Sequence, residues 1–165
     1  MIEARIEQTP IDLAAMLNRA AALEGVGAVA TFTGLVRADD GVTELMLEHY
    51  PGMTERALHG LCVDAAARWR LTGALLVHRV GAMYPGDAVV MVVTAAPHRA
   101  DALAACAFLI DRLKTDAPFW KRETRGEDVR WVAARDSDHE AADRWRWGPA
   151  HKAEPTPRPV GANQK

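Results

Sequence analysis

The chain has 165 residues, a mass of 18.0 kDa and a formal net charge of −2. This length suits one ordinary domain, whose core needs no disulfide or metal to be stable. The lack of a basic excess argues against a general nucleic-acid-binding function. The N-terminal sequence MIEARIEQTP has no apolar stretch of the kind found in signal peptides, and the two cysteines form no CxxC pair. We therefore expect a soluble, cytoplasmic protein.

Basic side chains are concentrated in one part of the chain. Residues 1–97 carry 7 basic and 11 acidic side chains, whereas residues 98–147 carry 10 of each. Five basic side chains fall between Arg112 and Arg125, with Asp116 and Glu123 among them. A local basic cluster in an acidic protein indicates a small anionic ligand or an acidic partner surface.

The first part of the chain predicts a strand, a helix and two further strands. Residues 1–8 alternate as a strand, after which Thr9 is expected to cap a helix that has Pro10 at its first position. An apolar stretch rich in β-branched residues predicts a buried strand at 28–36, and residues 42–50 alternate as another strand. Because only a short turn separates these two strands, we expect them to pair as a hairpin.

The rest of the chain continues to alternate between strands and helices. The expected elements are a helix at 54–69, strands at 73–80 and 88–95, a helix at 98–114, a hairpin of strands at 119–123 and 129–133, and a helix at 137–145 capped by Ser137. The strand at 88–95 is continuously apolar and should be central. This order predicts an α+β fold with a mostly antiparallel sheet and flanking helices. We expect one domain over residues 1–147 and a disordered, Pro-rich tail over 148–165.

Several large functional classes lack their motifs in this chain. The patterns GxxxxGK[ST], GxGxxG, HExxH and GxSxG do not occur. The six histidines show no metal-ligand spacing with a cysteine or aspartate. Both cysteines, Cys62 and Cys106, lie on apolar helix faces and are expected to be buried structural thiols. We therefore expect no bound metal.

Charged side chains at the ends of predicted elements are the candidates for chemistry. Arg37 closes the apolar strand TFTGLVR, where its guanidinium can bind a phosphate or carboxylate, or simply remain solvated. His98 and Arg99 open the long helix, whose free N–H groups attract anions. A cation pair at that end opposes the helix dipole unless an anion lies between them, and a solvent-exposed pair is the alternative interpretation.

A second group of charges brackets the segment DAPFW. Lys114 ends the long helix, where a cation also suits the dipole, and Lys121, Arg122 and Glu123 follow the segment. Each lysine alone would be a surface charge, but a lysine held against a rigid apolar segment can act as a base or nucleophile. A straight helix places His98 about 24 Å from Lys114. The two ends therefore form two sites, or a second subunit supplies one end of a shared site.

Longer segments, taken in order, form a specific pattern. They are FTGLVR, LEHYPGMTERAL, HRVG, YPGD, APHR, LKTDAPFWKRE and RWVAARD. Together, over about residues 31–145, they resemble the catalytic large subunit of molybdopterin synthase. The resemblance implies an α/β-hammerhead type of fold and a homodimer within a heterotetramer that includes a small ubiquitin-like carrier. It also implies an enzyme of molybdenum cofactor biosynthesis. Such an enzyme moves sulfur from the carrier's C-terminal Gly-Gly thiocarboxylate to cyclic pyranopterin monophosphate, making the dithiolene of molybdopterin.

The same resemblance implies roles for individual residues. It implies Lys114 and Lys121 as catalytic residues, and as substrate-binding residues Arg37, His98, Arg99, Arg122, Glu123 and Arg135. It implies no cofactor and no metal, because a thiocarboxylate is already a sulfur nucleophile. One departure is Leu35, where some relatives have lysine, so one cation near the substrate is missing.

Two other functions stay open on the sequence. In the first, the protein is a non-catalytic anion-binding or scaffold module that docks an acidic partner through its basic cluster. In the second, it is a cysteine sulfurtransferase that carries a persulfide on Cys62 or Cys106. The apolar context of both cysteines counts against the second function, since a reactive thiol needs a low pKa.

Overall fold

The computed structural model describes residues 1–132 and 136–145, and its strands form two sheets of four. The first sheet has the order β1 (Ile2–Glu7), β4 (Gly73–Arg79), β6 (Ala88–Ala96) and β2 (Ala28–Leu35). The second has the order β5 (Gly81–Met83), β3 (Glu44–His49), β7 (Phe119–Arg125) and β8 (Asp128–Val132). Only the β1–β4 pair is parallel among these strands, which confirms the predicted α+β fold with mostly antiparallel pairing.

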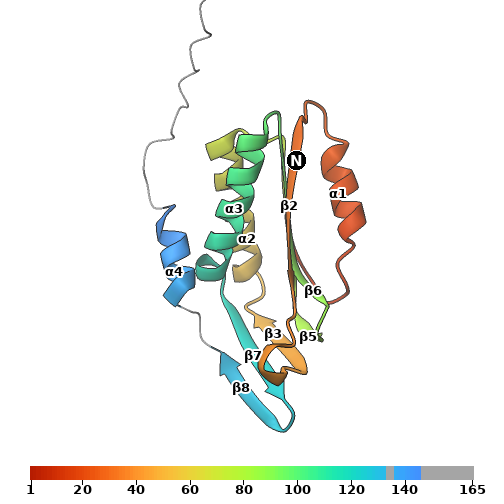
Figure 1. Ribbon diagram of the computed structural model, residues 1–165. Helices are drawn as coiled ribbons and strands as arrows, with labels where there is room; N and C mark the ends of the chain where they lie inside the picture. Colours follow the sequence, from red (N-terminus) through yellow and green to blue (C-terminus); the bar gives the residue numbers. More distant parts are fainter. Residues whose placement is uncertain (133–135, 146–165) are drawn as a thin grey trace, which may run out of the picture.

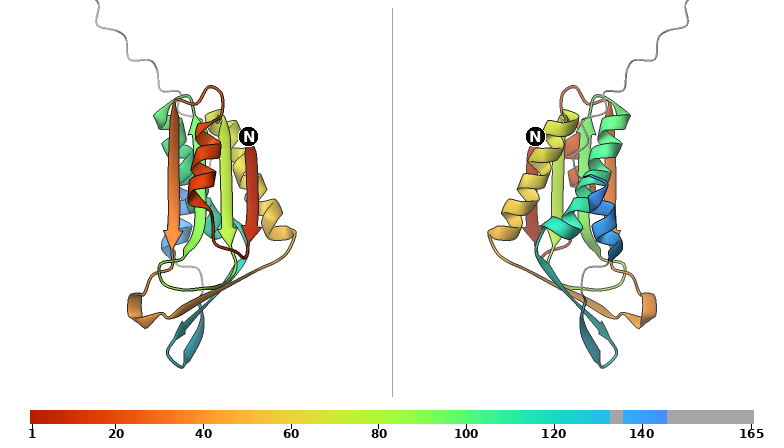
Figure 2. Two further views of the ribbon diagram at one scale, coloured as in Figure 1. Left: turned by 90° about the vertical axis from the view of Figure 1, so that its right-hand side faces the viewer. Right: turned by 90° about the vertical axis from the view of Figure 1, so that its left-hand side faces the viewer.

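Helices cover both faces of the first sheet (Figures 1 and 2). Helix α1 (Leu13–Ala21) lies on one face, and α2 (Met53–Trp69) and α3 (Arg99–Asp116) lie side by side on the other. Helix α4 (Asp136–Asp143) packs against α3. The second sheet extends from one end of the first, at the bottom of Figure 1. Among the described residues, no helix combines the length and apolar character needed to cross a membrane.

The two inner strands of the first sheet are apolar because they contribute to two cores. In β4, Leu75 and Val77 pack on the side of α1, whereas Leu76 packs against α2 and α3. In β6, Val93 and Val92 divide between the two cores in the same way. A strand covered on both faces needs apolar side chains at successive positions, which explains the continuous apolar run that predicted a central strand.

A third and smaller core joins the two sheets. Its buried members come from the connections that leave the first sheet and from the strands of the second: Val36, Leu45, Leu47, Val80 and Met83. Phe119, the first residue of β7, packs against this core. This core anchors the second sheet to the first.

Two local predictions are wrong. Helix α1 begins at Leu13 and not at Pro10, because the Asp12 side chain accepts a hydrogen bond from the Ala15 N–H at 2.9 Å. Asp12 is as good an N-cap as Thr9 and lies directly before the first helical residue. The stretch containing Thr9 and Pro10 instead forms the connection from β1.

The expected hairpin between residues 28–36 and 42–50 does not form either. Strand β2 pairs with β6, and β3 pairs with β5 and β7, so the two segments belong to different sheets. The chain leaves the first sheet at Val36, whose N–H donates to the Asp87 carbonyl. It then turns through a short 3₁₀ segment, in which Asp40 has a left-handed φ of 55°. Strand β2 pairs instead with the long apolar strand β6, which lies more than 50 residues later in the chain.

The C-terminal part agrees with the sequence in outline. The predicted hairpin is present as β7 and β8, and α4 begins at Asp136, one residue before the expected cap Ser137. Helix α4 is followed by Trp145, whose Nε1 donates to Asp111 on α3 at 2.7 Å. The predicted disordered tail at 148–165 lies outside the described residues, so the domain boundary at residue 147 stays a prediction.

Candidate functional site

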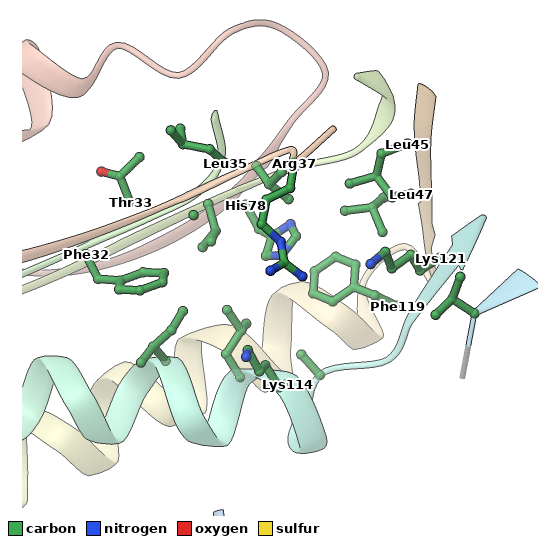
Figure 3. A pocket seen from close by; sticks show the side chains of 17 residues that line it. Phe32, Thr33, Leu35, Arg37, Leu45, Leu47, His78, Lys114, Phe119 and Lys121 are labelled. Carbon is green, nitrogen blue, oxygen red and sulfur yellow. The ribbon is translucent and has the colours of Figure 1, made fainter. Parts of the chain in front are cut away.

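One cavity of about 800 Å³ lies where the two sheets meet the C-terminal end of α3 (Figure 3). Its walls are mostly apolar side chains, among them Phe32, Leu35, Leu45, Leu47, Leu113 and Phe119. These residues come from β2, β3, α3 and β7, so the cavity forms where elements remote in the chain meet.

Three of the predicted site residues line this cavity. Arg37 reaches it from the chain that leaves β2, Lys114 from the last turn of α3, and Lys121 from β7. Figure 3 shows the three side chains extending into the cavity from different sides. Arg37 also lies 3.0 Å from the Asp39 carboxylate, and both of these side chains are largely exposed. The cavity thus combines an apolar wall with three positive charges near its opening.

Glu123 holds Lys121 in place without lining the cavity itself. Its carboxylate lies 2.7 Å from Lys121 Nζ and 2.9 Å from Arg125 Nη2. The hydrogen bond from Lys121 is the main cause that lowers the pKa of Glu123, and Arg125 lowers it further. The alternation of β7 places these three side chains on the same face of the sheet. The Glu123 carboxylate therefore fixes the direction of the Lys121 side chain.

The other predicted residues are not brought to this cavity within one chain. Arg122 lies on the opposite face of β7, where its guanidinium carbon is 5.8 Å from the Trp131 ring centroid. Its Nε is buried without a hydrogen-bond partner. His98 and Arg99 lie at the start of α3, about 24 Å from Lys114 by helix rise. Their substrate contacts stay predictions, as does that of Arg135, which lies outside the described residues.

The corner between α3 and β7 carries both lysines and is fixed from two directions. Thr54, fully buried at the start of α2, donates a hydrogen bond to the Pro118 carbonyl at 3.0 Å and accepts one from the Tyr50 N–H at 3.1 Å. On the other side, His78 stacks on Phe119 with ring centroids 4.1 Å apart and an interplanar angle of 24°. The backbone that carries Lys114 and Lys121 is therefore held rigidly in place.

Sequence reasoning missed both Thr54 and His78. His78 is 7% exposed and lines the cavity at the end of β4. Burial is the main cause that lowers the pKa of His78 to about 4, so the imidazole is neutral near pH 7. The signal was present in the segment ALLVHRV, because a histidine that directly follows four apolar residues of a buried strand requires a specific environment.

Both cysteines are buried and unpaired, which confirms the prediction of structural thiols. Burial raises the pKa of Cys62 to about 12, and it raises that of Cys106 to about 11. Neither thiol lines the cavity. In residues 1–132 and 136–145, no three side chains of His, Cys, Asp or Glu are grouped as a metal site requires.

Comparison with known proteins identifies the family. The profile of the MoaE protein family matches residues 6–116. The molybdopterin synthase catalytic subunit of Cereibacter sphaeroides is 52% identical over 122 residues, which cover 73% of this chain and 84% of that protein. The corresponding subunit of Ralstonia nicotianae is 47% identical over 148 residues, which cover 86% of this chain and 82% of that protein.

A solved structure extends this similarity to three dimensions. Molybdopterin cofactor biosynthesis protein E from Burkholderia multivorans superposes with a TM-score of 0.76 at 48% identity, and the match covers 88% of this chain and 97% of that one. Sequence and fold therefore agree with the resemblance first seen in the motifs. The chain belongs to the MoaE protein family.

Proposed function

We propose that this protein is the catalytic subunit of a molybdopterin synthase. It transfers sulfur from the C-terminal thiocarboxylate of a small ubiquitin-like carrier to cyclic pyranopterin monophosphate, and so makes the dithiolene of molybdopterin. Its family membership supports this function. The observation in the structure that carries the proposal is the convergence of Arg37, Lys114 and Lys121 on one apolar cavity.

The electrostatics of the cavity suit these reactants. Both the phosphate of the substrate and the thiocarboxylate of the carrier are anions, and the three lining cations complement them. Apolar walls lower the local dielectric, which strengthens each charge interaction relative to water. The thiocarboxylate supplies its own sulfur nucleophile, so the buried state of Cys62 and Cys106 is compatible with the reaction.

We assign Lys114 the main catalytic role. The thiocarboxylate sulfur forms a bond to a substrate carbon and displaces an oxygen substituent there. Water then attacks the carrier's acyl carbon, which breaks its bond to sulfur and releases the carrier as a carboxylate. Lys114 donates hydrogen bonds to the carrier's terminal carbonyl oxygen as negative charge develops there. Lys121, oriented by Glu123, and Arg37 bind the substrate. Arg122 and Arg135 remain expected substrate contacts.

The assembly follows from the length of α3. Because His98 and Arg99 lie too far from Lys114 to share a small ligand in one chain, a second copy supplies them. We therefore propose a homodimer within a heterotetramer that includes two carriers. The two unpaired cysteines suit the reducing conditions of the cytoplasm, where we expect the protein to act.

A defined reconstitution tests the proposed function. Purified protein is mixed with thiocarboxylated carrier and cyclic pyranopterin monophosphate, and the dithiolene is measured after oxidation to its fluorescent derivative. We expect product with the thiocarboxylated carrier and none with the same carrier ending in a plain carboxylate. Absence of product from folded protein that binds the carrier would overturn the proposal.

Mixed dimers test the shared site. Lys114→Ala and His98→Ala chains, each inactive alone, are combined so that one site of the mixed dimer regains both residues. We expect part of the wild-type activity to return. If verified mixed dimers stay inactive, the site is not shared between subunits.

A further inference from the structure

His78 is a polar side chain of the cavity that the proposed reaction leaves without a role. It occupies the end of β4, where its neighbours Leu76 and Val77 are buried apolar residues. Figure 3 shows its ring beside Phe119 and behind the Arg37 side chain. A polar ring at a buried position that also lines a ligand cavity needs an explanation beyond packing.

The hydrogen bonding of the ring defines its protonation. Nδ1 lies 2.9 Å from the Arg79 carbonyl oxygen, and a carbonyl oxygen only accepts hydrogen bonds, so Nδ1 carries the proton. Because the ring is neutral, Nε2 then has a free lone pair. Among the described residues, the hydrogen bond of the ring is the one that Nδ1 makes. Nε2 is therefore an available acceptor.

The orientation of this acceptor is fixed in advance. The stack on Phe119 sets the plane of the ring, and the bond to the Arg79 carbonyl sets its rotation within that plane. The remaining freedom of Nε2 is small, so a ligand that bonds to it does not have to order the side chain first.

The chemistry of Nε2 complements that of the cations. Arg37, Lys114 and Lys121 can only donate hydrogen bonds, so they bind the anionic parts of a ligand. A carboxylate at position 78 would supply an acceptor but would also repel those anions. A neutral imidazole supplies an acceptor without negative charge, which suits the uncharged N–H group of a ligand that is anionic elsewhere.

We infer that Nε2 of His78 accepts a hydrogen bond from an amide-type N–H group of the ligand that fills this cavity. The inference rests on the proposed function and assigns that site a further specificity-determining residue. Two reactants offer such a group: the glycine amides of the carrier tail and the ring N–H groups of the pterin. Both require the same acceptor, and separate binding measurements distinguish them.

Two substitutions separate hydrogen bonding from packing. His78→Phe keeps a flat ring against Phe119 but removes the acceptor, whereas His78→Gln keeps an acceptor oxygen. His49→Gln is the matched control, because His49 is a nearby, mostly buried histidine that does not line the cavity. For each variant, carrier affinity is measured by calorimetry with the plain carboxylate form, and the KM for the substrate is measured in the reconstituted reaction.

We expect His78→Phe to weaken one of these two constants by about 5- to 100-fold, the usual effect of leaving a donor unsatisfied. His78→Gln should recover part of the loss, and His49→Gln should match the wild type. A weakened carrier affinity identifies a glycine amide as the donor, and a raised substrate KM identifies the pterin. Folded His78→Phe protein with both constants within twofold of wild type would overturn the inference.

A measurement on the unchanged protein avoids any folding defect of the variants. In ¹⁵N NMR of the imidazole, the Nε2 resonance should shift when saturating carrier or substrate is added. An unchanged resonance with both ligands bound contradicts the inference. Turnover of the wild type distinguishes the two proposals. If the wild type makes no product, the proposed function is overturned. If the wild type makes product normally and the His78 variants are unaffected, only the role of His78 is overturned.

Discussion

The two sheets have equal numbers of strands, but the first is built from buried apolar side chains and the second carries exposed and charged ones. In the first sheet, Leu76 and Val92 are fully buried at the centre of strands covered by helices on both faces. In the second sheet, β7 carries four charged side chains within seven residues, and Trp131 on β8 is 58% exposed. The first sheet provides stability, and the second provides charged groups that burial on both faces would exclude.

The candidate site lies where these two regions meet. Phe119 packs into the core that joins the sheets, and two positions later Lys121 lines the cavity. The first sheet thus positions the start of β7, whereas the later residues of β7 can carry charged side chains. If this division is correct, substitutions in the two regions should separate stability from activity.

The largest effect should come from Lys114→Ala. We expect turnover to fall by roughly 10²- to 10⁴-fold, the range for loss of one charge-stabilising or proton-transferring group. Lys114 is exposed, so the free energy of unfolding should change by less than about 0.5 kcal/mol. The product assay, carrier calorimetry and urea unfolding measure the three consequences.

Arg112→Ala is the matched control, since Arg112 lies on the same helix and pairs with Asp116 outside the cavity. It should retain near-normal turnover. Comparable losses in both variants would mean that general charge, and not the position of Lys114, matters for the reaction.

Leu76→Ala should give the opposite result. Leu76 is fully buried against α2 and α3, so its truncation leaves a cavity and should lower the free energy of unfolding by about 2–5 kcal/mol. Turnover per folded molecule should stay close to wild type. A large loss of turnover in fully folded Leu76→Ala protein would show that the first sheet does more than support the site.

The third effect is a pH dependence that comes from His78. Because its folded pKa is about 4, below the ordinary value of about 6.5, the unfolded chain binds a proton more readily. The contribution of His78 to the free energy of unfolding is therefore complete above about pH 6.5, and it decreases as the pH falls toward 4. Between pH 7.5 and pH 5 we expect a loss of about 2 kcal/mol from this residue. Urea unfolding at both pH values measures it.

The control for this measurement is His78→Phe, which cannot titrate. Its loss of stability between the same pH values should be smaller than that of the wild type by about the His78 contribution. Equal pH dependence in the two proteins would show that burial does not lower the pKa of His78.

The sequence predicted the first sheet better than the second. An apolar run such as AVVMVVTA indicates a strand buried on both faces wherever it occurs, so β6 was found without knowing its partners. The pairing of β2 and β3 was wrong because it depends on strands remote in the chain. Strand β5 was missed because three residues carry too little pattern to be recognised.

The same distinction applies to the site. Lys114 and Lys121 were found because a rigid Pro-Phe-Trp segment lies between them in the sequence. Thr54 was missed, because its contact with Pro118 joins residues 64 positions apart. His98 and Arg99 were predicted as a pair, and no contact within one chain brings them to the cavity, so their role in a partner subunit's cavity stays a proposal.

Thr54→Val tests the corner between the two regions. The substitution keeps the shape of the side chain but leaves the Pro118 carbonyl and the Tyr50 N–H without their partner. We expect the free energy of unfolding to fall by about 1–3 kcal/mol, together with a several-fold loss of turnover. Thr54→Ser, which keeps the hydroxyl, should recover most of both. If Thr54→Val loses stability but keeps full turnover, the bond to Pro118 does not position the lysines.

The smallest effect on activity should come from removing both thiols. A persulfide mechanism needs a cysteine that is exposed and readily ionised, whereas burial raises the pKa of Cys62 to about 12 and that of Cys106 to about 11. Both side chains pack in the core between the first sheet and its helices, which is where the comparison of the two sheets places structural residues. The double variant Cys62→Ala/Cys106→Ala should therefore lose about 1–2 kcal/mol of stability but stay within twofold of wild-type turnover per folded molecule. A folded double variant without turnover would place the chemistry in the buried core, and would overturn both the sulfur transfer proposed here and the division between a stabilising and a functional sheet.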